Sequence, residues 1–344
     1  GLVTRWARFT RDGDMTGGNF PAWLPTLFAI GPAGQASAGN LVDRRGECVH
    51  AGCAHYRACH VERAIRASKH ADIVIANHAL VMSQAAFDGA RTARGQKSDI
   101  ESVALKRIVF DEGHHLFEAA DSAFSAVLSG AEAAELRRWI RGPEGRGRRG
   151  RGLEQRLMEL VGEREHAREA LNAAIRAAGA LPGEGWSNRI AAPNGDVAPS
   201  GPVEHFLVAV LEQLKARAEP SEIGMECAAR PATDLVRETA RTAAEALAAL
   251  EAPLLSLARN LADMLDDESD TLTTVDRARI EGALRGLDRR ARMHLPSWRS
   301  MLKAIEENAE DDPDFVDWFD ATFLYGRVVD AAARRNYVDP SQPL

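Results

Sequence analysis

The sequence lacks the features that mark membrane proteins, secreted proteins and generally basic DNA-coating proteins. It contains no uninterrupted apolar run of about 18 residues, so we predict no membrane span. The N-terminal stretch GLVTRWARFTRDGDM has no apolar core and does not resemble a secretory signal. The net charge of −7 argues against a basic coat protein, although a local basic groove is compatible with it. We therefore expect a monomeric, cytoplasmic protein without a membrane partner.

Two chemical signatures are also missing. The sequence has only four cysteines among 344 residues, and three of them are clustered, which favours metal binding over a disulfide framework. It contains neither a G-x4-G-K-[ST] loop that would cradle phosphates nor an HExxH helix that would hold zinc. The length predicts two or three domains, and a hydrophobic content of 45% is enough to build their cores.

The first third of the chain changes character after the cysteines. Residues 1–70 are loop-rich, whereas residues 71–120 have an α/β pattern. Ile73–Ile75 and Ile108–Phe110 are compact apolar runs of the kind that form buried strands, and we expect a helix after each. Asn77 stands where the first of these helices would begin. Two short strands, each followed by a helix, predict a parallel sheet that is covered on both faces.

Residues 121–335 are rich in Ala, Leu, Arg and Glu with a helical period, so we predict a largely α-helical domain there. Pro253 is expected to kink or divide one long helix. The run Asp312-Pro313-Asp314 is typical of a helix start, and the acidic stretch 306–320 is expected to be a solvated face. The predicted core-facing stripes are Leu153, Leu157, Leu160, Leu171 and Ile175, and then Leu247, Leu250, Leu254, Leu257, Leu261 and Leu265.

Three cysteines lie close together in ECVHAGCAHYRACH, residues 47–60, as Cys48-x4-Cys53-x5-Cys59. Their density on a polar segment is hard to explain by packing, although three unligated thiols in a loop is the simplest interpretation. Zinc held by three thiolates and one histidine is chemically possible, and so is an iron–sulfur cluster. The surrounding segment from Asp43 to Lys69 is basic, which favours thiolates and phosphate contacts.

The second signal is IVFDEGHHL, in which an apolar strand delivers Asp111 and Glu112 at its C-terminal end. A carboxylate held at a sheet edge suits Mg²⁺ on a nucleotide, and a second one beside it can orient the attacking water. With His114 in the fourth position, the run resembles a DEAH box in which Gly113 replaces Ala. A small metallohydrolase site made of Asp111, His114 and Glu118 is the competing interpretation.

The order of these segments, a cysteine triplet, ADIVIANHALVM, IVFDEGHHL and a long helical region, resembles the iron–sulfur superfamily 2 DNA helicases of the DinG/XPD type. The resemblance implies an α/β plus α fold, with a RecA-like parallel sheet interrupted by a 4Fe–4S insertion and a helical Arch-type insertion. It divides the chain into an iron–sulfur domain (1–70), part of the first motor domain (71–120), the Arch-like domain (121–335) and a return segment (336–344).

The resemblance also implies functions for single residues. Cys48, Cys53 and Cys59 would be iron ligands of the 4Fe–4S cluster. Asp111 would hold the Mg²⁺ of ATP, Glu112 would activate the water, and His114 would couple nucleotide state to DNA binding. The contacts with single-stranded DNA would come from Asn77, His78, Arg57 and Arg63. The parent protein would be an ATP-dependent 5′→3′ helicase of the kind used in DNA repair.

The sequence departs from the family pattern in two respects. The family uses four cysteines, and no cysteine precedes Cys48 here, while Cys227 lies far away in the predicted helical region. The phosphate-cradling loop is missing as well. We therefore expect that the fourth ligand and the P-loop belong to a longer parent protein, and that these 344 residues alone do not hydrolyse ATP. The alternative function is a zinc-stabilised helical module that binds nucleic acid or protein without catalysis.

Overall fold

The structure is a computed structural model, and it is of the mixed α/β kind, mostly helical with one small antiparallel sheet. The chain forms two compact units, one of residues 1–75 and 268–286 and one of residues 76–267 and 287–344. The residues that the structure describes are 2–14, 20–21, 55–92, 107–144, 152–162, 164–193, 195, 197–219, 224–267, 272–308, 312, 314–339 and 341–342.

The first unit contains short helices around the cysteine-bearing segment. Trp6 of α1 packs edge-to-face against the buried Phe20, with ring centroids 4.8 Å apart. Arg66 of α3 lies over the ring of Tyr56, 5.0 Å from its centroid. The elements of this unit are α1 (Leu2–Phe9), the 3₁₀ turn η3 (Tyr56–Ala58), α3 (His60–Ser68) and most of α12 (Thr274–Arg289), whose last three residues belong to the second unit.

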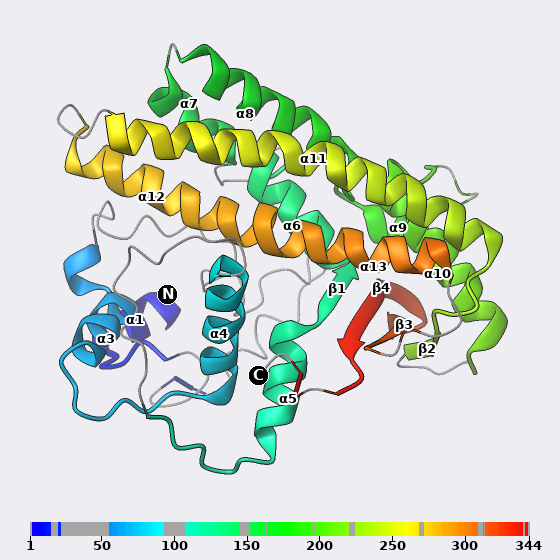
Figure 1. Cartoon of the computed structure of the whole chain (residues 1–344), viewed down its shortest axis with the longest axis horizontal. Coiled ribbons are helices and arrows are strands. Elements are labelled where there is room, and N and C mark those ends of the chain that lie inside the picture. The colour runs from blue at the N-terminus through cyan, green and yellow to red at the C-terminus, as the bar shows by residue number, and fades with distance from the viewer. Residues whose placement is uncertain are drawn as a thin grey trace. The chain divides into compact units, whose positions relative to one another are not determined.

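The second unit is built on a long helix, α11 (Asp234–Asp267), which packs against α8, α10 and α13 (Figure 1). Pro253 lies inside this helix. We predicted that it would kink or divide the helix, and the prediction of a division is wrong because α11 is continuous. The other helices are α4 (His78–Thr92), α5 (His115–Phe124), α6 (Gly130–Arg141), α7 (Leu153–Val161), α8 (Glu165–Ala177), η4 (Ala178–Ala180), α9 (Trp186–Ala191), α10 (Pro202–Arg217), the π-helix η5 (Arg290–His294) and α13 (Leu295–Glu307).

The core of this unit confirms most of the predicted apolar stripes. The leucines at steps of three and four along α11 from Leu247 to Leu261 are fully buried, and those of α7 and α8 are buried too. Leu265 and Ile175, at the ends of their stripes, are partly exposed. A helix of this kind is stabilised mainly by the burial of its apolar face, which is why its periodicity is visible in the sequence.

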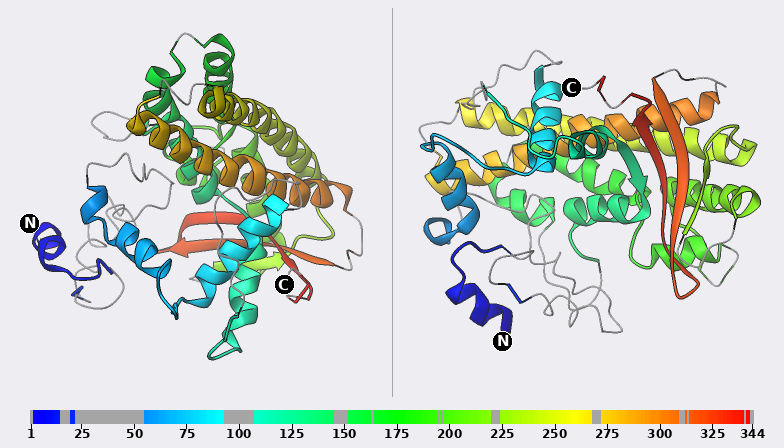
Figure 2. Two further views of the ribbon diagram at one scale, coloured as in Figure 1. Left: turned by 60° about the vertical axis from the view of Figure 1, so that its left-hand side comes forward. Right: turned by 90° about the horizontal axis from the view of Figure 1, so that it is seen from below.

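A four-stranded antiparallel sheet in the order β1-β4-β3-β2 lies within the region that we predicted to be helical (Figure 2). Its strands are β1 (Ala126–Ser129), β2 (Gly224–Ala228), β3 (Phe315–Leu324) and β4 (Arg327–Tyr337). Leu128 and Phe319 both pair with Ala333, and all three are fully buried. The ring of Phe319 meets that of Phe206 on α10 edge-to-face at 6.3 Å, which places α10 on the core face of the sheet.

The acidic stretch 306–320 differs from its prediction. Of the predicted helix start, the structure describes Asp312 and Asp314, and neither is helical. The alternating pattern of the following residues forms β3 instead. Asp317 lies on the core face, where its fully buried carboxylate pairs with Arg335 at 2.7 and 2.8 Å and with Arg230 at 2.6 Å. The cations that neutralise this acid come from distant parts of the sequence, so the local composition does not reveal them.

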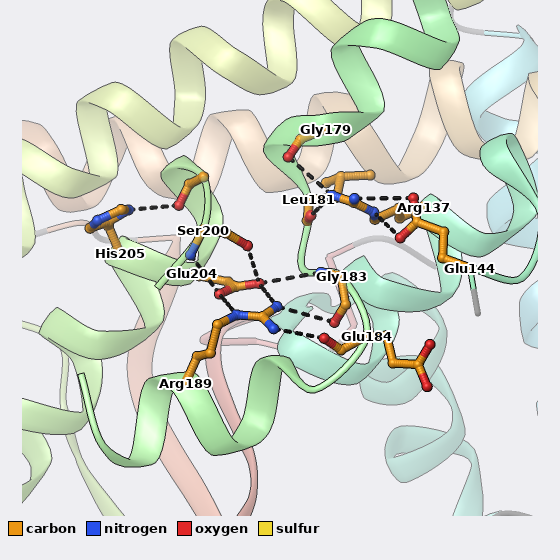
Figure 3. Close-up of polar contacts among 11 residues, drawn as sticks. Arg137, Glu144, Gly179, Leu181, Gly183, Glu184, Arg189, Ser200, Glu204 and His205 are labelled. Atoms are coloured by element: carbon orange, nitrogen blue, oxygen red, sulfur yellow. Dashed lines mark hydrogen bonds and ion pairs between the residues drawn. The ribbon is translucent and has the colours of Figure 1, made fainter. Parts of the chain in front are cut away.

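The connection between η4 and α10 is held by a second buried carboxylate (Figure 3). Glu204, near the start of α10, has a side chain with no exposed surface. It accepts hydrogen bonds from Arg189 at 2.6 and 2.8 Å, from both the backbone N–H and the hydroxyl of Ser200, and from the backbone N–H of Gly183. These bonds satisfy the carboxylate completely, so we assign Glu204 a structural role.

The two predicted strands of the parallel sheet are not formed among the residues that the structure describes. Residues 73–77 and 107–110 have no regular secondary structure. The side chain of Ile75 is 96% exposed and that of Val109 is 93% exposed. A short strand of this composition is stable only when neighbouring strands pair with it and helices cover both faces. The only sheet in the described part of the chain is antiparallel and lies elsewhere.

Within the described ranges, no helix combines the length and the apolar character that are necessary to span a bilayer.

Candidate functional site

The first part of the candidate site is the start of α4, where the structure confirms the predicted helix. The side-chain oxygen of Asn77 accepts a hydrogen bond from the backbone N–H of Leu80 at 2.8 Å. Its backbone carbonyl accepts from the N–H of Val81 at 3.3 Å. Asn77 therefore caps α4, because a side-chain oxygen here satisfies an N–H that has no partner within the helix. The next residue, His78, is the first of the helix.

The second part is the turn that leads into α5, which carries the Asp-Glu-Gly-His run. The backbone N–H of Glu112 donates to Asp111 Oδ1 at 3.1 Å, and the carbonyl of Glu112 accepts from the N–H of His115 at 3.0 Å. Glu112 has a φ of 50°, a left-handed conformation that is uncommon outside glycine. Such strain is found more often at functional sites than elsewhere.

The polar side chains of this turn point into solvent. Asp111, Glu112 and His114 are all exposed, and Nδ1 of His114 lies 3.3 Å from Oε2 of Glu112. Asp111 keeps its second oxygen, Oδ2, outside that local hydrogen bond. The turn thus presents two carboxylates and an imidazole side by side, and these groups are chemically suited to a hydrated divalent cation and a proton relay.

An aromatic contact brings the two parts together. The ring of His78 stacks on that of Phe110, with centroids 5.9 Å apart and an angle of 27° between the planes. The helices that follow, α4 and α5, also pack against each other (Figure 1). The Asn77-His78 pair and the acidic turn lie some 30 residues apart in the sequence, yet the structure makes them neighbours.

The metallohydrolase interpretation receives less support. His114 stands at the N-cap position of α5 and pairs with Glu112, whereas Glu118 is paired with His115, its Oε2 lying 3.6 Å from the Nδ1 of that ring. In the described part of the chain, no three His, Cys, Asp or Glu side chains converge as metal ligands.

Two of the three clustered cysteines, Cys48 and Cys53, lie outside the described residues. Cys59 is described, and it is a half-buried free thiol at the N-cap position of α3. Its carbonyl accepts a hydrogen bond from the N–H of Arg63 at 3.0 Å. Cys227 lies on β2 of the other unit, not in a helix, and burial raises the pKa of its thiol.

The predicted DNA contacts of the first unit lie on either side of Cys59. Arg57 is in η3 and Arg63 is in α3, and both side chains are exposed. The ring of His60, a possible fourth zinc ligand, lies directly against Gly13, where a Cβ atom would come within 2.8 Å of it. Arg57 and Arg63 are thus available to a phosphate backbone, while the imidazole of His60 is packed against the chain.

The sequence reasoning missed one exposed aromatic feature. Tyr325 and Gly326 form the turn between β3 and β4, and the side chain of Tyr325 is 95% exposed. The available signal was a glycine between two alternating runs, which is typical of a hairpin.

Comparison with models of known protein families finds none that matches this chain, and comparison with curated proteins finds no relative.

Proposed function

We propose that this chain is part of an ATP-dependent DNA helicase that moves 5′→3′ along single-stranded DNA. It would comprise the iron–sulfur domain, part of the first RecA-like motor domain and a helical Arch-like domain. One observation carries the proposal. The exposed turn at residues 111–114 displays Asp, Glu and His in the order of a DEAH box, directly after an apolar run and directly before a helix. The capped Asn77-His78 helix start contacts the same apolar run.

Each polar residue of the turn has a separate role in the proposed ATP hydrolysis. Asp111 is exposed, and its oxygen Oδ2 takes no part in the local hydrogen bond to Oδ1, so this carboxylate suits water-mediated contact with Mg²⁺. Glu112 is placed to orient the attacking water, and its pairing with His114 links that water to a group that can sense nucleotide state. The metal itself would supply charge neutralisation for the phosphates.

The exposed apolar runs support the same proposal. Ile108, Val109 and Phe110 present apolar side chains to solvent immediately before the acidic turn. Exposed runs of this kind mark surfaces that another part of a structure covers. In a complete motor domain, the runs at 73–75 and 108–110 would be neighbouring parallel strands of the RecA-like sheet, with Asp111 and Glu112 at its carboxyl edge.

ATP hydrolysis by the complete gene product tests this assignment. We expect Asp111→Asn and Glu112→Gln each to lower the DNA-stimulated rate by about a hundredfold or more, the scale of acid–base and metal contributions. Gly113→Ala is the matched control, because a Cβ atom there meets no neighbour within 4 Å and restores the usual DEAH residue. Equal rates in wild type and Glu112→Gln would contradict the assignment of Glu112.

The metal separates the helicase from the alternative, a zinc-stabilised binding module. The half-buried free thiol of Cys59 suits either metal centre. We expect the gene product, purified without oxygen, to contain iron and sulfide and to absorb broadly in the visible range. Replacing Cys59 with Ser should remove that absorption. Stoichiometric zinc without visible absorption would favour the binding module instead.

A further inference from the structure

The turn between β3 and β4 has an unusual residue at its tip. Leu324 pairs with Arg327, so the turn consists of Tyr325 and Gly326 alone. Their φ angles are 50° and 72°, both in the left-handed region that two-residue hairpin turns of this class require. Asn-Gly is the favoured pair for such a turn, because the left-handed backbone conformation is strained for a bulky residue. The chain places an aromatic residue at the least favourable position of the hairpin.

The penalty is not offset by packing within the protein. The side chain of Tyr325 is 95% exposed, and its neighbour Leu324 is 58% exposed. The turn lies at the lower end of the sheet in the right-hand view of Figure 2. An aromatic residue that is both strained and exposed contributes nothing to the core. We therefore expect its side chain to contact a ligand or another part of the assembly.

The charges around the tip favour a phosphate-bearing ligand. Residues 322–329 contain one charged side chain, the exposed cation of Arg327. The nearest acids along the two strands are already engaged. Asp320 is paired with Arg334, and Asp330 accepts hydrogen bonds from the backbone N–H groups of residues 131 and 331 at 3.2 and 2.9 Å. Arg327 is therefore the charged side chain nearest the tip along these two strands, and it can meet an anion there. On β2, the exposed Glu226 lies opposite Asp320 and not at the tip.

We propose that the β3–β4 tip is a contact for single-stranded DNA, in which the ring of Tyr325 stacks on a base and Arg327 contacts an adjacent phosphate. Stacking on aromatic side chains is sequence-tolerant, because every base has a π face. The exposed Leu324 would lie against the edge of the same base. This inference rests on the proposed function for the choice of ligand, since a helicase holds a single strand over several nucleotides.

The test measures how tightly the full chain binds a fluorescein-labelled oligothymidylate of about 16 nucleotides, the upper site size of single-strand-binding folds. We expect Tyr325→Ala to weaken the affinity roughly 5- to 150-fold, the range for loss of one stacked base. Tyr325→Phe should bind like wild type, because it keeps the ring. Arg327→Ala should weaken binding and reduce its dependence on salt.

Tyr325→Asn separates binding from folding. Asn is preferred in this turn, so thermal unfolding should show a hairpin at least as stable as in wild type, while DNA affinity falls as it does for Tyr325→Ala. Val316→Ala, an exposed apolar position at the far end of β3, is the matched control and should not change affinity. Wild-type affinity in both Tyr325→Ala and Tyr325→Asn would overturn the inference, and it would leave the proposed function standing.

Two further outcomes are distinguishable. If the wild-type chain binds no oligothymidylate at all, the DNA contact at the tip is excluded, and the ATP hydrolysis of Glu112→Gln then decides the proposed function by itself. If Tyr325→Phe loses affinity as strongly as Tyr325→Ala, the hydroxyl rather than the ring makes the contact. That result would replace stacking by a hydrogen bond and overturn the inference as stated.

Discussion

Two short apolar segments of the second unit have similar compositions but differ in burial. β1 reads Ala-Val-Leu-Ser and is nearly all buried, because β4 pairs with it and Leu128 faces the core. Residues 108–110 read Ile-Val-Phe and are exposed, with Val109 at 93%. Apolar composition makes a segment suitable for a sheet, but only a paired neighbour buries it. Among the described residues, no strand pairs with the exposed segment.

The largest expected effect is the loss of a buried charge next to the antiparallel sheet. Asp317→Ala would leave the buried Arg335 and the half-buried Arg230 without their main counter-ion, so we expect a loss of about 3–5 kcal/mol in the free energy of unfolding. Asp314→Ala, an exposed residue in the same acidic stretch, should cost less than about 0.5 kcal/mol. Chemical denaturation of both variants measures the difference, and similar small losses would show that the network is not stabilising.

The next prediction compares the loss of stability caused by a substitution in each of the two apolar segments. Leu128→Ala removes a fully buried side chain, and we expect a cost of about 2–5 kcal/mol. Val109→Ala changes an exposed side chain and should alter stability by less than about 0.5 kcal/mol. Denaturant midpoints at equal slope would report both values. A large loss in Val109→Ala would mean that residues 108–110 are already buried, and the comparison would not hold.

The smallest expected effect depends on pH. Burial, together with the nearby Arg289 and Arg290, lowers the pKa of His294 from 6.5 to about 4. The folded protein keeps this imidazole neutral, whereas the unfolded chain takes up a proton below pH 6.5. The contribution of His294 to the free energy of unfolding should therefore be constant above that pH and fall as the pH drops towards 4, by about 2 kcal/mol at pH 5.

His294→Gln checks the cause of this pH dependence. The variant should lose about 2 kcal/mol less stability than wild type when the pH is lowered from about 7.5 to about 5. Thermal or denaturant unfolding at the two pH values gives the comparison. An identical loss in both proteins would show that other groups titrate in this range and that His294 does not.

Local sequence patterns were sufficient to predict those helices whose structure depends mainly on their own residues. The leucine stripe of α11 predicted a buried helix face, and Asn77 predicted the start of α4. A helix was expected after the Asp-Glu-Gly-His run, and α5 begins directly after His114. Helix periodicity and helix capping depend on residues a few positions apart, so they can be seen in a single sequence.

The predictions that failed concern contacts between distant residues. The four-stranded sheet joins residues 126–129 to residues 327–337, and no local pattern specifies that pairing. Asp317 seemed a solvated acid because Arg335 lies in another strand and Arg230 lies farther still along the chain. Residues 108–110 seemed a buried strand because their composition fits one, although burial depends on neighbours that the composition does not contain.

Strand separation by the complete gene product tests the central claim most directly. The substrate is a short duplex with a single-stranded tail at either its 5′ or its 3′ end. We expect the wild-type protein to displace the strand only with ATP and only from the 5′-tailed duplex, and we expect Glu112→Gln to bind the same DNA without displacing it. Three results would contradict the account. They are strand displacement without ATP, displacement from the 3′-tailed duplex alone, and no displacement at all by a protein with an intact metal centre.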